Sequence, residues 1–352
     1  MVRKMRKQEH IELYLETFDK KKRNFFDDFK FVHNSLPETD IKEINIETTL
    51  FNRIKIRSPF FINAITGGTL ESKEINKVIA HIAKEMEIPM AVGSQYITLE
   101  DESTADSFKI ARQVNPDGII FANAGAMISV ESANKMIDMV EADALQIHLN
   151  VPQEVMMDEG DRCFKGYIAN IEKLVAKLKL PIIVKEVGFG ISGETAKILA
   201  DIGVHAIDIG GKGGTNFIEI ENKRSDKDPN NIFLEWGIPT GVSLVECIKS
   251  VPNKIDIIAS GGIWDGLSVA KALSIGAKAV GIAGLILYLL IKEGKDKLIN
   301  TLKNIENELI ISMLMLGSKN INELKKCPII ITGESKEWLE LRGYEVYSYA
   351  RR

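Results

Sequence analysis

Short apolar or β-branched runs recur along the chain, and most of them end in glycine, serine, asparagine or another small polar residue. Most of the segments that follow carry apolar residues at helical spacing, such as Ile75, Val78, Ile79 and Ile82. Near-continuous apolar strands that alternate with helices are typical of a parallel sheet. Eight runs have this form, at residues 60–64, 89–92, 118–122, 144–150, 181–187, 206–209, 255–259 and 279–283.

Eight strand–helix units predict an α/β fold in which the strands close into a (β/α)₈ TIM barrel. A doubly wound open sheet is the competing architecture. The least secure of the eight units is the third, because the segment that should form its helix, 131–141, is only weakly amphipathic. We expect one domain over residues 1–352, made of an N-terminal extension (1–58), a barrel core (59–296) and a C-terminal helical extension (297–352). The apolar stretch 309–316 is expected to cover the barrel or to form a subunit contact.

The connection after the sixth predicted strand is unusually long and covers residues 216–240. A connection of this length in a compact domain is usually functional or disordered. It contains a polar run at 222–231. We expect this run to act as a mobile lid that becomes ordered when ligands bind.

The overall composition excludes several classes of protein. A formal net charge of −4 gives no support for nucleic acid or an anionic membrane as a partner. Three widely separated cysteines argue against a disulfide framework or a zinc site and fit a reducing compartment. The charged N-terminus differs from a secretory signal, and the longest apolar run, 281–291, is too short to span a bilayer. We therefore expect a soluble, cytoplasmic protein.

The predicted strand ends are rich in glycine, and barrel enzymes place their active sites at these ends. A single glycine pair most often marks a tight turn. Gly261, Gly262 and Gly284, however, follow the seventh and eighth strands, where barrels often bind phosphate through backbone N–H groups. We expect a phosphate site there.

The fourth predicted strand alternates apolar and polar residues, so Gln146, His148 and Asn150 should point into the barrel. A lone inward histidine is usually a satisfied core residue, but three polar residues on one face indicate a site. Gln153 and Glu154 follow at the rim. Glu154 is either a helix N-terminal charge or a ligand for Mg²⁺, which prefers one or two carboxylates together with water and phosphate oxygens.

Two further groups of charged residues stand out. Lys185 lies within an apolar strand, which is costly unless the lysine is paired or functional. It is a candidate Schiff-base lysine, a cation beside an anionic cofactor, or a partner of Glu186. Near the N-terminus, Arg6, Lys7 and His10 form a cluster that is either a solvated face or a phosphate-binding group.

Taken together, these motifs resemble those of type 2 isopentenyl-diphosphate isomerases, which are FMN-dependent barrels. The resemblance runs in order from residue 6 to residue 284. The combination of its HLN…QE, KEVG and GGTN motifs is specific, whereas glycine pairs occur in other flavin barrels. The motifs are Arg6-Lys7…Glu9-His10, Thr66-Gly67-Gly68, Gly93-Ser94-Gln95, Asn123, His148-Leu149-Asn150…Gln153-Glu154, Lys185-Glu186-Val187-Gly188, Gly213-Gly214-Thr215-Asn216, Trp236-Gly237-Ile238-Pro239-Thr240 and Ser260-Gly261-Gly262.

The resemblance implies an isomerase that interconverts isopentenyl and dimethylallyl diphosphate, with reduced FMN as acid–base cofactor and NADPH as its reductant. It implies that Glu154 binds Mg²⁺, that Gln153, Lys185 and His148 are catalytic, and that the protein forms a tetramer or octamer. The diphosphate substrate would be faced by Arg6, Lys7, His10, His148, Asn150 and Gln153. FMN would be held by Ala64, Ile65, Thr66, Ser94, Asn123, Lys185, Thr215, Gly261, Gly262, Ala283 and Gly284.

The sequence departs from the family pattern at four positions. Ile65, Tyr96, Gly210 and Trp264 stand where the family often has Met, Arg, Ser and Arg. Three other functions remain open at this point: an FMN-dependent oxidase or dehydrogenase of small hydroxy acids, a Schiff-base aldolase that uses Lys185, and a flavin-binding protein without catalysis. The first would need a catalytic histidine paired with a carboxylate-binding arginine, and the second half of the chain shows no such pair.

Overall fold

The eight predicted strands form a closed parallel barrel, so the open sheet is excluded. The protein was analysed as a computed structural model, which describes residues 2–19, 26–225 and 231–352, with side chains from residue 5. The ring closes where the last strand pairs with the first, Val280 lying opposite Phe60. Its strands are β4 (Phe60–Ile62), β5 (Met90–Ala91), β6 (Ile120–Gly125), β7 (Ala144–Leu149), β8 (Ile182–Glu186), β9 (Ala206–Asp208), β10 (Asp256–Ser260) and β11 (Ala279–Ile282).

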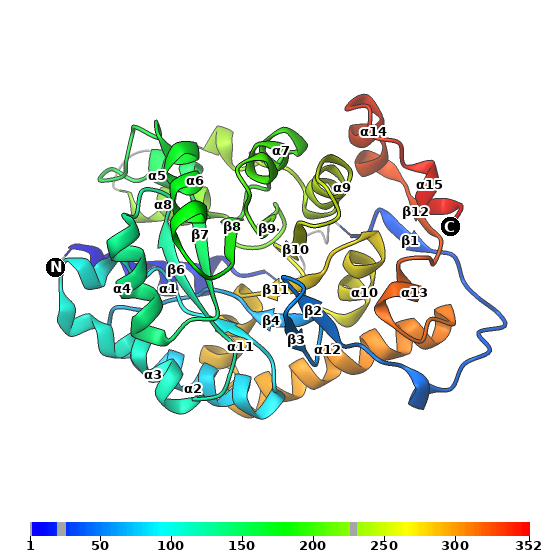
Figure 1. The fold of residues 1–352 in the computed structure, drawn as a ribbon, viewed down its shortest axis with the longest axis horizontal. Helices are drawn as coiled ribbons and strands as arrows, with labels where there is room; N and C mark the ends of the chain where they lie inside the picture. Colours follow the sequence, from blue (N-terminus) through cyan, green and yellow to red (C-terminus); the bar gives the residue numbers. More distant parts are fainter. Residues whose placement is uncertain (1, 20–25, 226–230) are drawn as a thin grey trace.

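Helices surround this ring (Figure 1). The unit with the weakest sequence signal does form a helix, α4 (Val130–Val140), which Ser129 caps by accepting a hydrogen bond from the Ser132 amide. The remaining helices that follow the strands are α2 (Leu70–Met86), α3 (Asp106–Val114), α5 (Val151–Met156), α6 (Tyr167–Lys177), α7 (Gly193–Asp201), α8 (Phe217–Arg224), α9 (Thr240–Ser250), α10 (Gly266–Ile275) and α11 (Gly284–Lys292). Short 3₁₀ helices occur at η1 (Ile41–Glu43), η2 (Gln95–Leu99), η3 (Glu102–Ala105) and η4 (Asn231–Phe233).

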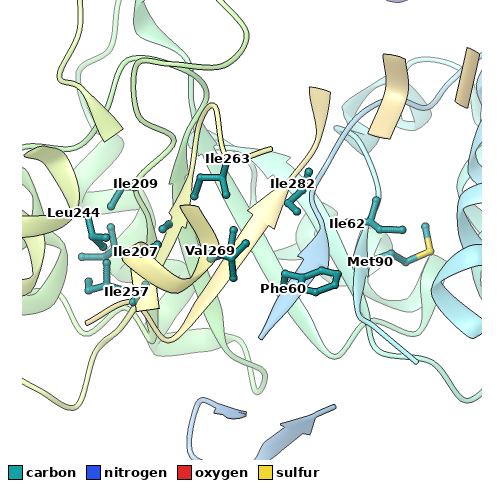
Figure 2. Close-up of a cluster of buried hydrophobic side chains, with 14 of the residues drawn as sticks. Phe60, Ile62, Met90, Ile207, Ile209, Leu244, Ile257, Ile263, Val269 and Ile282 are labelled. Atoms are coloured by element: carbon teal, nitrogen blue, oxygen red, sulfur yellow. The ribbon is translucent and has the colours of Figure 1, made fainter. Parts of the chain in front are cut away.

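Alternation along the strands divides the buried apolar residues into two layers. Phe60, Ile62 and Ile282 belong to the layer that packs between the strands and the helices (Figure 2). Phe61 and Phe121 belong to a separate cluster. Because successive side chains of a strand point to opposite faces, this second cluster fills the interior of the ring.

The N-terminal extension closes the end of the barrel at which the strands begin, which we call the lower end. Its strands β2 (Thr48–Leu50) and β3 (Ile54–Ile56) form a hairpin. Leu50 and Ile56 are buried against the interior cluster, and the Phe51 amide donates to the Asp256 carboxylate at 2.6 Å. The hairpin therefore fills the end opposite to the one where barrel active sites form.

At the other end, helix α1 (Val2–Thr17) packs against α8 and brings its inner face to the carboxyl ends of the strands. The long connection at 216–240 is thus partly helical, and Asn222 is buried within α8. The predicted lid at 222–231 otherwise falls largely on residues 226–230, which lie outside the described residues.

The C-terminal extension adds a strand to the predicted helices. Helix α12 (Lys295–Leu316) begins two residues before the expected boundary, and it covers the barrel by packing on α10 and α11 (Figure 1). Strand β12 (Ile329–Ile331) pairs antiparallel with β1 (Phe29–Phe31), so the two extensions meet. The short helices are α13 (Ile321–Leu324), α14 (Gly333–Leu341) and α15 (Tyr347–Ala350).

Across the described residues, the helices are all too short or too polar to cross a bilayer. The three cysteines are free thiols, and Cys163 is the exposed one.

Candidate active site

A cavity of about 520 Å³ lies at the carboxyl ends of the barrel strands, with α1 along one side. Every residue assigned a role from the sequence lines it, although these residues come from nine separate segments of the chain. They are Arg6, Lys7, His10, Ala64, Ile65, Thr66, Ser94, Asn123, His148, Asn150, Gln153, Glu154, Lys185, Thr215, Gly261, Gly262, Ala283 and Gly284.

A chain of buried side-chain hydrogen bonds crosses the barrel beneath this cavity. The Asp208 carboxylate accepts from Ser260 Oγ and from Asn63 Nδ2, the latter at 2.7 Å. Asn63 Oδ1 accepts from Gln146 Nε2 at 2.9 Å, and Gln146 Oε1 accepts from Asn123 Nδ2 at 3.0 Å. Asn123 Oδ1 is then left to pair with His148 Nδ1 at 2.8 Å.

This order fixes the protonation pattern of His148. Because the amide group of Asn123 is already used as a donor, its oxygen must accept, so Nδ1 of His148 carries the hydrogen. Burial, followed by the charges of Lys185 and Lys7, lowers the pKa of His148 to about 3. His148 is therefore neutral and contributes hydrogen bonds, while the positive charge at the cavity comes from other residues.

Helix α1 supplies part of that charge. Lys7 Nζ donates to the Ser94 carbonyl at 2.8 Å, and Arg6 lies 3.8 Å from Glu159 at the rim. His10 Nε2 lies 2.8 Å from Glu221 Oε1. The N-terminal cluster thus lines the cavity, and the interpretation of it as a solvated face is wrong.

Glu221 is a buried residue of the site that sequence reasoning missed. It is 1% exposed, and Gln153 Nε2 donates to its Oε1 at 3.2 Å while Arg224 Nε donates to its Oε2 at 2.8 Å. The signal was its spacing: Glu221 lies three residues after Ile218, on the buried face of α8.

Lys185 points inward from β8 and is 7% exposed. Its Nζ donates to the backbone carbonyl of Glu186 at 2.9 Å. The Glu186 carboxylate instead accepts from the amides of Val187 and Phe189, each at 2.6 Å, and burial raises its pKa to about 7. A side-chain ion pair between the two residues is therefore not what holds Lys185, and its charge remains available to the cavity.

Glu154 is held at the cavity rim by two hydrogen bonds. Its Oε1 accepts from Asn150 Nδ2 at 2.9 Å, and its Oε2 accepts from the Asp161 amide at 2.9 Å. In the described part of the chain, histidines, cysteines and acids nowhere gather in threes as a complete metal site. One carboxylate beside side-chain amides nevertheless suits Mg²⁺, which takes its other ligands from water and phosphate.

The opposite side of the cavity is lined by glycine backbone. Gly261 and Gly262 have φ values of +106° and +74°, and a β-carbon on Gly261 would lie 2.1 Å from the Gly211 carbonyl. Helix α11 begins here at Gly284, and Ala283 before it offers no side-chain cap. Uncapped amides at a helix N-terminus beside bare backbone suit a phosphate group, so these residues fit the flavin phosphate expected from the sequence.

Comparisons with known proteins identify the family. A model of the FMN-dependent dehydrogenase family matches residues 131–330. The isopentenyl-diphosphate delta-isomerase of Geobacillus sp. (strain WCH70) is 46% identical over 356 residues, covering 100% of both chains. That of Listeria welshimeri is 42% identical and covers 100% of this chain and 98% of its own. The chain belongs to the isopentenyl-diphosphate delta-isomerase family.

Two solved structures that are similar to this chain are mandelate oxidases. A mandelate oxidase with benzoyl-formic acid matches with a TM-score of 0.67 at 16% identity, covering 92% of this chain and 94% of its own. A mandelate oxidase mutant with a monooxide FMN adduct matches with a TM-score of 0.64, also at 16% identity, covering 91% and 92%. At this identity the likeness concerns the fold alone.

The structure shows what surrounds three of the residues that depart from the family pattern. Gly210 has a φ of +46°, and a β-carbon there would lie 2.0 Å from the Glu186 carbonyl, so this backbone requires glycine. Trp264 packs on Phe18 of the segment after α1, with ring centroids 5.7 Å apart. Tyr96 lines the cavity and is 38% exposed.

Proposed function

We propose that this protein interconverts isopentenyl diphosphate and dimethylallyl diphosphate. The observation that carries the proposal is the full-length identity of 42–46% to isopentenyl-diphosphate delta-isomerases. The cavity supports it, because a glycine-lined phosphate cradle and a cationic, amide-rich rim share one enclosed space.

The substrate head would bind at the rim. Arg6 and Lys7 offer charged donors, and a diphosphate is a strong acceptor for them. Glu154 would hold Mg²⁺, which would supply further positive charge for the diphosphate. Asn150 donates to both Glu154 and Gln153, so one side chain sets the positions of the metal ligand and of its neighbour.

The flavin phosphate would be held by the glycine-lined backbone at Gly261, Gly262 and Gly284. When bound in its reduced form, FMN supplies proton exchange with an unactivated alkene without net redox turnover. Lys185 presents its cation from β8, which favours an anionic reduced flavin. The residues proposed to hold the flavin are Ala64, Ile65, Thr66, Ser94, Asn123, Lys185, Thr215, Gly261, Gly262, Ala283 and Gly284.

Between these two subsites, the side chains orient the hydrocarbon tail. Gln153 is 9% exposed, and its amide group donates to Glu221 while its oxygen accepts from Asn150, so both ends of this side chain are held at the cavity wall. Neutral His148 borders the same space and adds no charge that would attract water.

Three finer features belong to the same proposal. NADPH would reduce the flavin, the protein would act in the cytoplasm, and copies of the chain would form a tetramer or octamer. These rest on the family resemblance and, for the location, on three free thiols.

An anaerobic assay tests the proposal. The protein is incubated with isopentenyl diphosphate, FMN, Mg²⁺ and NADPH, and dimethylallyl diphosphate is followed by NMR. We expect many turnovers while the flavin stays reduced. Absence of product from a protein whose flavin does reduce would favour a hydroxy-acid oxidoreductase, and substrate trapped on Lys185 by borohydride would favour an aldolase.

A further inference from the structure

Tyr14 is a buried residue of α1 to which the mechanism assigns no role. It lies on the cavity-facing side of the helix, seven residues after Lys7 and four after His10, and it is 7% exposed. Its ring packs edge-on against Phe18 at 5.8 Å, and Phe18 stacks on Tyr288 at 4.1 Å. These contacts hold the Tyr14 ring in one orientation.

The Tyr14 hydroxyl meets the start of α11. A β-carbon placed on Gly284 would lie 2.1 Å from the hydroxyl oxygen, so glycine is needed for this approach. Tyr14 also lines a small outer hollow together with Gly214, Thr215 and Trp264. Tyr14 therefore lies between the glycine-lined side of the cavity and this outer hollow.

The hydroxyl has no hydrogen-bond partner among the residues that the structure describes. Burial raises the pKa of Tyr14, so the phenol remains a neutral donor. Tyr14 lines the cavity, so an acceptor for this hydroxyl would be a ligand bound there. The first amides of α11 next to it also lack a side-chain cap. Two unsatisfied sets of donors thus converge on one place, which suits an anionic oxygen.

We infer that the Tyr14 hydroxyl donates a hydrogen bond to the phosphate of the bound flavin nucleotide and closes the phosphate pocket from solvent. This inference rests on the flavin-binding part of the proposed function and is independent of the isomerisation. The substrate diphosphate is the other available phosphate, but its proposed partners Lys7 and His10 lie about 10 Å and about 6 Å away along the helix, at roughly 1.5 Å per residue.

The test compares two flavins that differ only in the phosphate. FMN-free full-length protein is titrated with FMN and with riboflavin, and the dissociation constants are measured by flavin fluorescence. For Tyr14→Phe we expect FMN to bind about tenfold more weakly, as for one hydrogen bond to a charged group, with riboflavin unchanged. Tyr288→Phe is the matched control, because it removes a hydroxyl from the same aromatic cluster outside the cavity, and it should change neither constant.

A second measurement uses phosphorus NMR of bound FMN. The ³¹P signal should shift between wild type and Tyr14→Phe and stay in place in Tyr288→Phe. An unchanged FMN affinity and ³¹P signal would overturn the inference. Equal losses for FMN and riboflavin would show that Tyr14 acts through packing. A separate titration of the FMN-loaded proteins with isopentenyl diphosphate would assign the hydroxyl to the substrate if this binding alone were weaker in Tyr14→Phe. Because the flavin titrations use oxidised flavin and no substrate, an inactive isomerase would leave them interpretable.

Discussion

At the residue scale, one buried aspartate sets the orientation of a whole row of amides. Asn63 Nδ2 donates to the Asp208 carboxyl group at 2.7 Å, so Asn63 Oδ1 is left to accept from the next amide. The oxygen of each amide accepts from the amide group of the next one, which fixes the orientation of Gln146 and Asn123 in turn, and the row ends at His148. The backbone amide of Ala64 also donates to Asn63 Oδ1, which supports the same orientation.

This arrangement predicts a pH dependence of stability that comes from His148. Its pKa is about 3 in the folded protein, against 6.5 for an unperturbed histidine, so the unfolded chain binds more protons between these values. The free energy of unfolding therefore falls as the pH drops below about 6.5. In His148→Gln this contribution disappears, so between about pH 6 and pH 5 the wild type should lose about 1 kcal/mol more than the variant.

Urea unfolding of the flavin-free proteins at the two pH values measures this difference. Glu186, whose raised pKa acts in the opposite direction, is present in both proteins and cancels. An identical pH dependence in the two proteins would mean that His148 titrates alike in the folded and unfolded states.

Glu154 carries a second prediction at this scale. Glu154→Gln removes the charge that would hold Mg²⁺ but keeps the shape of the side chain, so we expect the Mg²⁺ concentration for half-maximal rate to rise about tenfold or more and the rate to drop sharply. Glu159→Gln is the control, since Glu159 borders the same cavity but pairs with Arg224 at 2.6 Å. Wild-type turnover and Mg²⁺ dependence in Glu154→Gln would remove Glu154 from the site.

At the scale of elements, one end of the barrel is filled by apolar packing and the other carries the candidate site. The β2–β3 hairpin fills the lower end with apolar side chains, and α1 brings polar ones to the upper end. Between them the inward-facing residues form layers: Phe61, Phe121 and Ile183 lie below, and Asn63, Asn123 and Lys185 follow two residues later on the same strands. The apolar layer supports the polar layer on which the ligands would rest.

This division predicts that lower-end changes affect stability and spare binding. Leu50→Ala opens a cavity in the interior cluster and should cost about 2–5 kcal/mol of unfolding free energy. The FMN dissociation constant should remain unchanged, because the hairpin is remote from the cavity. Ile54→Ala, opposite Leu50 in the hairpin but only partly buried, should cost less. A weaker FMN affinity in Leu50→Ala would show that the two ends are coupled.

The eight strands and their order were predictable because each barrel strand is a local apolar run that keeps its place in sequence. The paired strands β1 and β12 were not, since each has three residues and finds its partner about 300 positions away. Gln146, His148 and Asn150 followed from alternation on one strand, 144–150, whereas most other residues of the candidate site followed from the family resemblance. The same alternation would have predicted three more inward-facing polar residues, Asn63, Asp208 and Ser260, but it was used only on strand 144–150. The positions of Glu221 and Tyr14 could not be predicted in this way, because they depend on how α8 and α1 pack over the barrel.

At the scale of the whole molecule, the two extensions join the barrel to one another. Strand β1 pairs with β12, and Trp338 and Arg342 of the C-terminal segment donate to Glu246 of helix α9 at 3.0 and 3.2 Å. Phe29 is fully buried in the same cluster as the outer barrel residues. We therefore propose that residues 1–352 unfold as one cooperative unit.

Phe29→Ala tests this cooperativity, since it removes a buried ring from the contact between the extensions. If the chain is one unit, the loss of about 3–5 kcal/mol should lower the stability of the barrel as much as that of the extension. Urea unfolding is followed by Trp338 fluorescence, with Trp236 and Trp264 replaced by phenylalanine, and by release of bound FMN. Both transitions should move together. Ile330→Ala, on the exposed side of the same strand pair, should move them little. A Trp338 transition that shifts alone would instead show that the C-terminal extension unfolds independently, because the barrel would then keep its stability without the contact that Phe29 provides.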